Sequence, residues 1–308
     1  MKRCVGVKLT NGEECLVAFS HRKTGKDDEK QTVIMIHGLG SCGNVLDRTL
    51  ATSLITKAKA EGVGLDVFTL DLPGHGDSDK NLQKFSTDIS ADALLGFMEA
   101  KGLSSAHVYG VSLGGSTAIK FASKHPDKIR SLSVQGPPIN GRDWKLLRVL
   151  HGPALSPRYL LKLLKLNGFK PFTRLPEEKV LRILRGLNPG TDLGSLRRVC
   201  ELNKDMEGIL IEGIKKLSAV AVMDYACDIM ELDLRKELEN IALYKIPLMV
   251  VDGEKPEHRG VDTMERIAKI VPSARTLQIK GEGHLATVLG HETVAENLLD
   301  FIKNGSLQ

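Results

Sequence analysis

Gly110-Val111-Ser112-Leu113-Gly114-Gly115 is the stretch that decides the fold of this 308-residue chain. The apolar run Ala106–Tyr109 precedes it, and an amphipathic segment, Gly115–Lys124, follows it. A strand, a sharp glycine turn and a helix in that order form the setting that the G-x-S-x-G motif requires. Side chains at the two flanking glycines would collide with their neighbours, and the strained turn lifts the serine hydroxyl clear of the backbone. The stretch therefore predicts Ser112 as an exposed nucleophile, with a purely structural glycine turn as the alternative.

Strand and helix patterns alternate on both sides of this turn. Thr32–Ile36 is a short, continuous apolar run of the kind that is buried in a parallel sheet. Further strands are expected at residues 65–71, 106–109, 129–134, 247–251 and 276–279, with helices at 45–61, 89–101, 115–124, 261–270 and 291–303. Asn11-Gly12, between the runs Val5–Leu9 and Cys15–His21, predicts an opening antiparallel hairpin. The alternation indicates parallel βαβ units and therefore an α/β fold.

The alternation stops between Gly136 and Ile246. This segment carries leucine, lysine and arginine at helical spacing and is interrupted by prolines. We interpret it as an all-helical insertion. The predicted organisation is a core made of residues 1–136 and 246–308, with a helical cap at residues 137–245.

Composition and charge narrow the class of protein. The chain is 42% hydrophobic and 26% charged, which excludes disordered and fibrous proteins. Its formal net charge of +5 is too small to indicate nucleic-acid binding. The five cysteines are widely spaced and form no C-x-x-C, so neither a disulfide framework nor a metal site is expected, and a cytoplasmic location fits best. The sequence has no signal-peptide core and no apolar run long enough for a transmembrane segment.

A serine nucleophile needs a base, and a histidine near the end of the chain has the right setting. Gly281-Glu282-Gly283-His284 follows the expected strand at residues 276–279. The carboxyl ends of parallel strands share one edge of the sheet, so Ser112 and His284 are expected to meet there. A surface-loop histidine is the alternative interpretation.

The loop after the first buried strand is the third signal. His37-Gly38-Leu39-Gly40-Ser41 resembles the loop that supplies an oxyanion-hole N–H in lipases and esterases, which points to Leu39 N–H as one donor. Leu113 N–H, at the start of the helix after the serine, is the expected second donor. The spacing Gly38-x-Gly40-x-x-Gly43 also matches a dinucleotide-binding fingerprint, but that interpretation leaves Ser112 unexplained.

Four motifs occur in order along the chain: His37-Gly38-Leu39-Gly40, Asp71-Leu72-Pro73-Gly74-His75-Gly76-Asp77-Ser78, Gly110-Val111-Ser112-Leu113-Gly114 and Gly283-His284. This set resembles the α/β-hydrolase superfamily, in the branch whose helical cap follows the sixth strand. The resemblance covers nearly the whole chain and implies a mostly parallel eight-stranded sheet. It also implies serine hydrolase chemistry, with Ser112 as nucleophile, His284 as base and Leu39 and Leu113 as oxyanion donors. The second motif is structural in that family, and the serine excludes the dehalogenase and epoxide hydrolase branches, which carry aspartate there.

The catalytic acid is where the chain departs from the family pattern. The family places Gly-x-x-Asp after the strand that follows the cap, whereas this chain has Pro256 in the aspartate position. Glu257, one residue further on, is our first choice of acid because its longer side chain offsets a one-residue deletion. Asp252 is the second choice, and Asp143 is a weaker one. A chain without a triad acid would be a slow enzyme or a binding protein.

The predicted cap contains a basic segment. Residues 142–185 hold 11 lysines and arginines against 3 aspartates and glutamates. Leucines and cations in Arg158–Leu166 lie on opposite faces of a helix, a pattern typical of contact with an anionic or lipid-like substrate. An ordinary cap helix that buries its leucines and exposes its lysines has the same pattern.

The function that the sequence favours is a cytoplasmic serine hydrolase acting on a small-molecule carboxylic ester, lactone or thioester, without cofactor or metal. Two other functions stay open. One is carbon–carbon bond hydrolysis by the same residues, and the other is an α/β-hydrolase scaffold that binds a small molecule or a protein without turnover.

Overall fold

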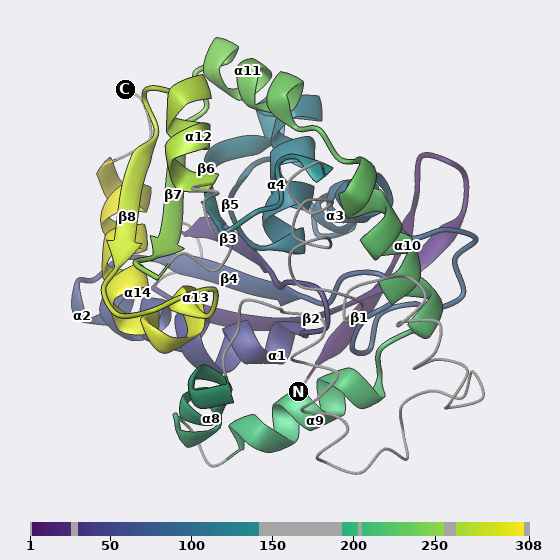
Figure 1. The fold of residues 1–308 in the computed structure, drawn as a ribbon, viewed down its shortest axis with the longest axis horizontal. Helices are drawn as coiled ribbons and strands as arrows, with labels where there is room; N and C mark the ends of the chain where they lie inside the picture. The colour runs from purple at the N-terminus through teal and green to yellow at the C-terminus, as the bar shows by residue number, and fades with distance from the viewer. Residues whose placement is uncertain (1, 26–29, 142–192, 203–204, 256–262, 305–308) are drawn as a thin grey trace.

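The computed structural model describes residues 2–25, 30–141, 193–202, 205–255 and 263–304. Within these ranges eight strands form a single sheet in the order β1-β2-β4-β3-β5-β6-β7-β8 (Figure 1). The strands are β1 (Arg3–Lys8), β2 (Glu14–Thr24), β3 (Gln31–Ile36), β4 (Leu65–Leu70), β5 (Ala106–Val111), β6 (Ile129–Gln135), β7 (Leu248–Gly253) and β8 (Arg275–Ile279). β2 pairs antiparallel with β1 and β4, and the remaining neighbours pair parallel. The predicted hairpin and parallel units are confirmed.

Helices connect the strands in the predicted alternation. Before the insertion they are α1 (Gly43–Leu46), the π-helical turn η2 (Asp47–Ala51), α2 (Thr52–Ala60), α3 (Thr87–Ala100), α4 (Leu113–Lys124) and the short 3₁₀ turn η3 (Pro126–Lys128). The later ones are α8 (Leu193–Glu201), α9 (Met206–Lys215), α10 (Ala219–Glu231), α11 (Arg235–Leu243), α12 (Thr263–Ile270), α13 (Ala286–Leu289) and α14 (His291–Asn304). The helix expected at 45–61 is divided by η2, where Thr49 Oγ1 donates to Val45 O and Thr52 Oγ1 donates to Asp47 O (both 2.7 Å).

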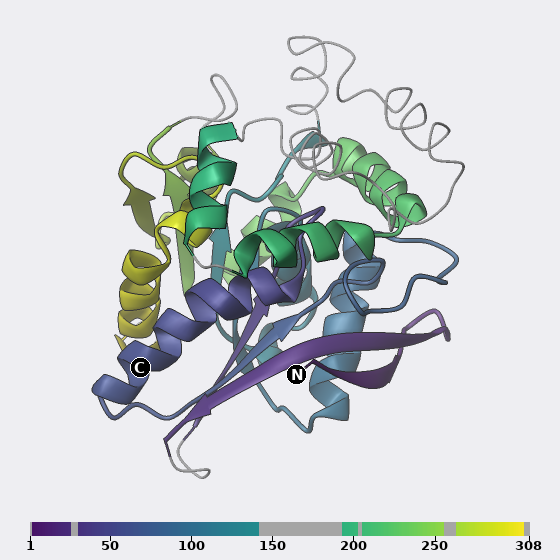
Figure 2. The ribbon, with the colours of Figure 1, turned by 90° about the horizontal axis from the view of Figure 1, so that it is seen from below.

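Alternate side chains of the central strands supply two separate apolar cores. Val108 of β5 and Ile34 of β3 belong to the core that α3 and α4 cover, whereas Tyr109 and Met35 belong to the core that α2 and α14 cover. All four side chains are buried. Strands covered by helices on both faces are continuously apolar in sequence, which explains the pattern in these runs. The fold is therefore a three-layer arrangement in which the sheet lies between two layers of helices (Figures 1 and 2).

The chain leaves the core after β6 and returns beside its own exit. Gly141 N–H donates to Leu232 O (2.6 Å), and Leu234 N–H donates to Ile139 O (2.9 Å). These two hydrogen bonds join the two ends of the insertion, and α8, α9 and α10 lie between those ends in the sequence. α11 follows and packs against α4. Paired ends of this kind are consistent with a helical insertion after the sixth strand. The exact core–cap boundary at residue 245 stays a prediction.

The described part of the insertion is docked on the turn after β4. Ser218 N–H, at the start of α10, donates to Gly74 O (2.8 Å). The Tyr225 hydroxyl of α10 donates to Pro73 O (3.1 Å). These bonds join the insertion to the second of the four motifs, which lies beside the candidate site.

Candidate active site

Ser112 stands on a strained turn between β5 and α4. Its φ of 51° and ψ of −117° lie in a region that side chains disfavour. A Cβ built on Gly110 would lie 2.3 Å from Gly114 O, and one on Gly114 would lie 2.5 Å from Ile36 O, so both positions require glycine. Ser112 N–H donates to Gln135 O (2.7 Å), which ties the turn to the end of β6. The turn has the geometry that the sequence predicts.

The start of α4 offers donors beside this serine. Ser112 precedes the helix, but its hydroxyl makes no capping hydrogen bond. Leu113 is the first helical residue, so its N–H is one of the four that have no acceptor within the helix. An N–H at this place is available to an anion that forms at Ser112.

The loop between β3 and α1 approaches Ser112 from the other side. A Cβ built on Gly38 would lie 3.1 Å from Ser112 Cβ and 3.8 Å from Ser112 Oγ. Ser41 N–H donates to Gly38 O (3.2 Å), and Gly40 has a φ of 75°. Leu39, between these glycines, is buried. The structure therefore brings the loops of both predicted oxyanion donors beside Ser112.

Two buried histidines hold this loop and are both neutral. His37 Nδ1 donates to Gly38 O (2.7 Å), while its Nε2 accepts from Leu72 N–H (3.1 Å). His75 Nε2 accepts from Gly40 N–H (3.3 Å), while its Nδ1 contacts Pro73 O (3.1 Å). Burial lowers the pKa of His37 to about 4 and that of His75 to about 3. We assign these tautomers from the partners, and they give both rings a positioning role.

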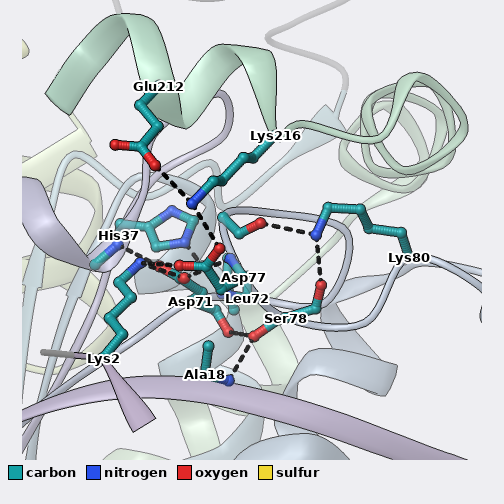
Figure 3. A network of polar contacts seen from close by, with 12 residues as sticks. Lys2, Ala18, His37, Asp71, Leu72, Asp77, Ser78, Lys80, Glu212 and Lys216 are labelled. Atoms are coloured by element: carbon teal, nitrogen blue, oxygen red, sulfur yellow. Dashed lines mark hydrogen bonds and ion pairs between the residues drawn. The ribbon is translucent and has the colours of Figure 1, made fainter. Parts of the chain in front are cut away.

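A carboxylate beneath the loop completes its support (Figure 3). Asp71 accepts hydrogen bonds from Gly43 N–H (2.7 Å), at the start of α1, and from Asp77 N–H (2.9 Å). The Lys2 ammonium also donates to this carboxylate. Burial by itself would raise the pKa of Asp71, but the charge of the Lys2 ammonium and the hydrogen bonds from Lys2 and from Asp77 N–H outweigh it and hold that pKa below its ordinary value. A buried, ionised Asp71 therefore fixes the start of α1 and with it the end of the oxyanion loop.

The same turn carries an ion pair to the insertion. Lys216, at the end of α9, lies 2.7 Å from Asp77 and 2.6 Å from Glu212 (Figure 3). Lys80 Nζ donates to Gly76 O and Ser78 O (both 2.7 Å) within the turn. The turn thus contacts the oxyanion loop on one side and α9 on the other.

Because of these histidines, we expect the free energy of unfolding to decrease as the pH is lowered. The unfolded chain takes up protons on His37 and His75 below about pH 6.5, whereas the folded chain takes them up only near their lowered pKa values. The free energy of unfolding should therefore be highest above about pH 6.5 and fall by about 1 kcal/mol per histidine for each pH unit down to about pH 4. Urea midpoints at several pH values measure this slope. Equal midpoints at about pH 7 and about pH 5 would contradict it, and His75→Asn should reduce the slope.

His284 and Asp252 converge on a glycine at the end of β6. A Cβ built on Gly136 would lie 3.1 Å from His284 Nδ1 and 3.9 Å from Asp252 Oδ1, and its φ of 49° also suits glycine. Gly136 follows Gln135, whose carbonyl accepts the Ser112 N–H. Burial lowers the pKa of His284 to about 4, so the imidazole is neutral near pH 7, as a general base must be. The predicted nucleophile, base and one of the predicted acids thus lie around this corner.

Of the three candidate acids, the described residues include Asp252 alone. Glu257 and Asp143 lie outside the described residues, as does Pro256. Asp252 is the penultimate residue of β7, and its Oδ1 accepts the Gly253 N–H (2.9 Å).

A buried polar chain beneath the histidine was not anticipated from the sequence. The Tyr109 hydroxyl lies 2.6 Å from Thr287 Oγ1, which in turn donates to Gln135 Oε1 (3.2 Å). All three residues are fully buried. The sequence carries little signal for this chain, because Gln135 ends a strand that also contains Arg130, Ser131 and Ser133, and nothing local indicates the partner of Gln135. The chain joins β5 and β6 to α13, which follows His284, and so holds the histidine loop against the sheet.

The described ranges hold neither a metal-binding cluster nor a helix suited to a membrane. No group of three or more histidine, cysteine or acidic side chains there is arranged to hold a metal ion. None of the helices in those ranges combines the length and apolar character that crossing a membrane would need.

Comparison with known proteins agrees with this geometry. A family described as alpha/beta hydrolase fold matches residues 31–290, and the chain belongs to that family. Lipase 3 of Moraxella sp. (strain TA144) is 27% identical over 95% of this chain and 81% of the lipase. A 2-hydroxy-6-oxononadienedioate/2-hydroxy-6-oxononatrienedioate hydrolase of Paraburkholderia phymatum is 29% identical over 42% of each chain. An esterase structure from Thermogutta terrifontis has a TM-score of 0.69 and 18% identity, covering 99% of this chain and 100% of the esterase.

The predicted α/β-hydrolase fold is confirmed by the sheet and by the family match. The family and its lipase relatives support a hydrolase enzyme.

Proposed function

We propose that this protein is a serine hydrolase that cleaves a small-molecule carboxylic ester, lactone or thioester. The observation that carries the proposal is the strained Ser112 turn, which lies between Gly38 of the oxyanion loop and the Gly136 corner where His284 lies. Nucleophile, base and oxyanion donors are the parts that acyl transfer needs.

The chemistry follows from these positions. Ser112 Oγ attacks the substrate carbonyl while His284 takes its proton, and the Leu39 and Leu113 N–H groups stabilise the oxyanion. The C–O or C–S bond then breaks, and His284 returns the proton to the leaving alcohol or thiol. Water, deprotonated by His284, next attacks the acyl-enzyme, the acyl C–O bond to Ser112 breaks and releases the carboxylic acid, and His284 returns the proton to Ser112 Oγ. Every proton and electron pair is accounted for without a cofactor or metal.

The names of the relatives support an ester-type substrate without identifying it. Lipases and esterases occur among them, as does a hydrolase of an oxo-dienedioate. That last relative keeps carbon–carbon bond hydrolysis as the second candidate. A panel of short-chain esters, lactones and diketones assayed side by side separates the two activities.

Two further parts of the proposal rest on the sequence. The basic residues of 142–185 lie outside the described part of the chain, so contact between the cap and an anionic or lipid-like substrate is proposed from their pattern. A cytoplasmic location is proposed from the cysteine pattern, and Cys4, Cys15, Cys42 and Cys227 carry free thiols.

The decisive test is reaction with a fluorophosphonate, which modifies a serine only where a base and an oxyanion hole activate it. We expect one adduct per chain, mapped to Ser112 by peptide mass spectrometry. His284→Gln should abolish the reaction, whereas His125→Gln, a change on the far end of α4, should leave it unchanged. A folded wild-type protein that stays unmodified would favour a binding protein instead.

A further inference from the structure

An ion pair joins the insertion to the loop that carries His284. The Arg198 guanidinium of α8 donates from Nη1 to Glu282 Oε1 (2.8 Å) and from Nη2 to Glu282 Oε2 (2.7 Å). The Glu282 side chain is 13% exposed and that of Arg198 is 44% exposed. Arginine and carboxylate that meet through two parallel hydrogen bonds have a defined relative orientation, unlike most surface pairs. The pair therefore fixes geometry as well as neutralising charge.

Glu282 lies in the loop that carries His284, so a contact that holds Glu282 also holds this loop. Glu282 lies two residues before His284, and its backbone carbonyl accepts the Lys255 N–H (2.9 Å). Gly281 N–H donates to Glu254 Oε2 (2.8 Å). A Cβ on Gly253 would lie 2.3 Å from Glu282 O, so the loops after β7 and β8 touch through their backbones.

The loop after β8 carries His284, and the loop that it contacts directly follows the end of β7, where Asp252 lies. α8 also packs against α13, which begins just after His284. The Arg198–Glu282 pair thus connects a helix of the insertion to the loops that set the histidine and the candidate acid.

We propose that Arg198 and Glu282 are positioning residues that make the catalytic geometry of His284 depend on the seating of α8. The proposal rests on the proposed serine hydrolase function. When α8 is seated, the carboxylate is neutralised and the histidine loop is held. Without Arg198, the mostly buried Glu282 carboxylate lacks that countercharge, and the loop shifts to bring it into water.

Charge exchange tests the pair directly. Arg198→Glu and Glu282→Arg are each expected to lower the rate constant for fluorophosphonate modification of Ser112 about ten-fold or more, and the double exchange should restore it to within about three-fold of wild type. Arg197→Glu is the matched control, since Arg197 is an exposed neighbour on α8 and makes no contact that the mechanism uses. Its rate constant should equal that of wild type.

If the charge-reversal variants fail to fold, Arg198→Gln and Glu282→Gln are used in their place. These two variants remove the charge and keep a polar side chain of similar length. Single variants that react like wild type, or a double exchange as slow as the singles, would overturn the proposal. For the rate of ester hydrolysis, a loss of kcat with little change in KM is expected, because the histidine and not the substrate pocket is displaced.

A second readout is independent of activity. The His284 ring proton, followed by NMR, should show no titration between about pH 5.5 and about 7.5 in wild type and a clear titration in Arg198→Gln, because a loosened loop admits water. The other acidic groups beside this loop, Asp252 and Glu254, are present in both proteins, so a difference in the His284 titration comes from the loss of Arg198. Identical titrations in the two proteins would overturn the proposal, whereas a wild type without Ser112 labelling would overturn the proposed function alone.

Discussion

Ser112→Ala is expected to lower the rate of ester hydrolysis by about 10⁴-fold to 10⁶-fold, to the residual level that binding and oxyanion stabilisation alone provide. The substitution removes only the attacking oxygen. The turn keeps its backbone bond to Gln135 O and its approach to Gly38, so substrate binding should change little. The measurement is kcat under saturation, together with the dissociation constant of an unreactive substrate analogue.

The strained turn at Ser112 also predicts that two inactive variants differ in stability. Ser112→Gly removes the side chain that the φ of 51° and ψ of −117° disfavour, so this variant should be more stable than Ser112→Ala by about 1 kcal/mol while equally inactive. Denaturant unfolding of the two variants and wild type compares them. A Ser112→Gly variant that is less stable than Ser112→Ala would show that the turn is not strained, and an active Ser112→Ala would remove the serine from the mechanism.

The parts of the fold that sequence predicts are those with a local cause. Gly110 and Gly114 have to be glycine because neighbouring backbone leaves no room for a side chain, and that need appears directly as a motif. Asn11-Gly12 likewise predicts a hairpin because its turn requires positive φ, and Gly12 has a φ of 89°. These features do not depend on any distant partner.

The parts that sequence does not predict are long-range pairings. Lys2 meets Asp71, and Arg198 meets Glu282 across 84 residues, yet nothing around either basic residue marks it among the 43 lysines and arginines. Gly136 is a similar case, since its need for glycine comes from His284, which another strand delivers. Such pairings arise only when the sheet order places one loop beside another.

The acid of the proposed triad is another long-range pairing that the sequence does not predict. From spacing alone Glu257 is the first choice, because Pro256 occupies the usual position. Glu257 lies outside the described residues, whereas Asp252 Oδ1 lies at the Gly136 corner, where His284 Nδ1 also lies. The Asp252 side chain is at the end of β7, whose neighbours β6 and β8 lead to Gly136 and to the His284 loop. We therefore expect Asp252 to orient the imidazole and to stabilise its protonated form.

Asp252→Asn should accordingly lower kcat by about 10³-fold to 10⁴-fold, because an amide facing Nδ1 favours the wrong histidine tautomer. The asparagine oxygen can still accept the Gly253 N–H, so the fold should be preserved and the loss should lie in the chemistry. Glu257→Gln is the matched comparison, since it makes the same charge-to-amide change five residues further along the chain. If Glu257→Gln causes the larger loss, Glu257 is the acid and the loop after β7 must bring it to His284; if neither variant loses more than about ten-fold, His284 works without a carboxylate partner.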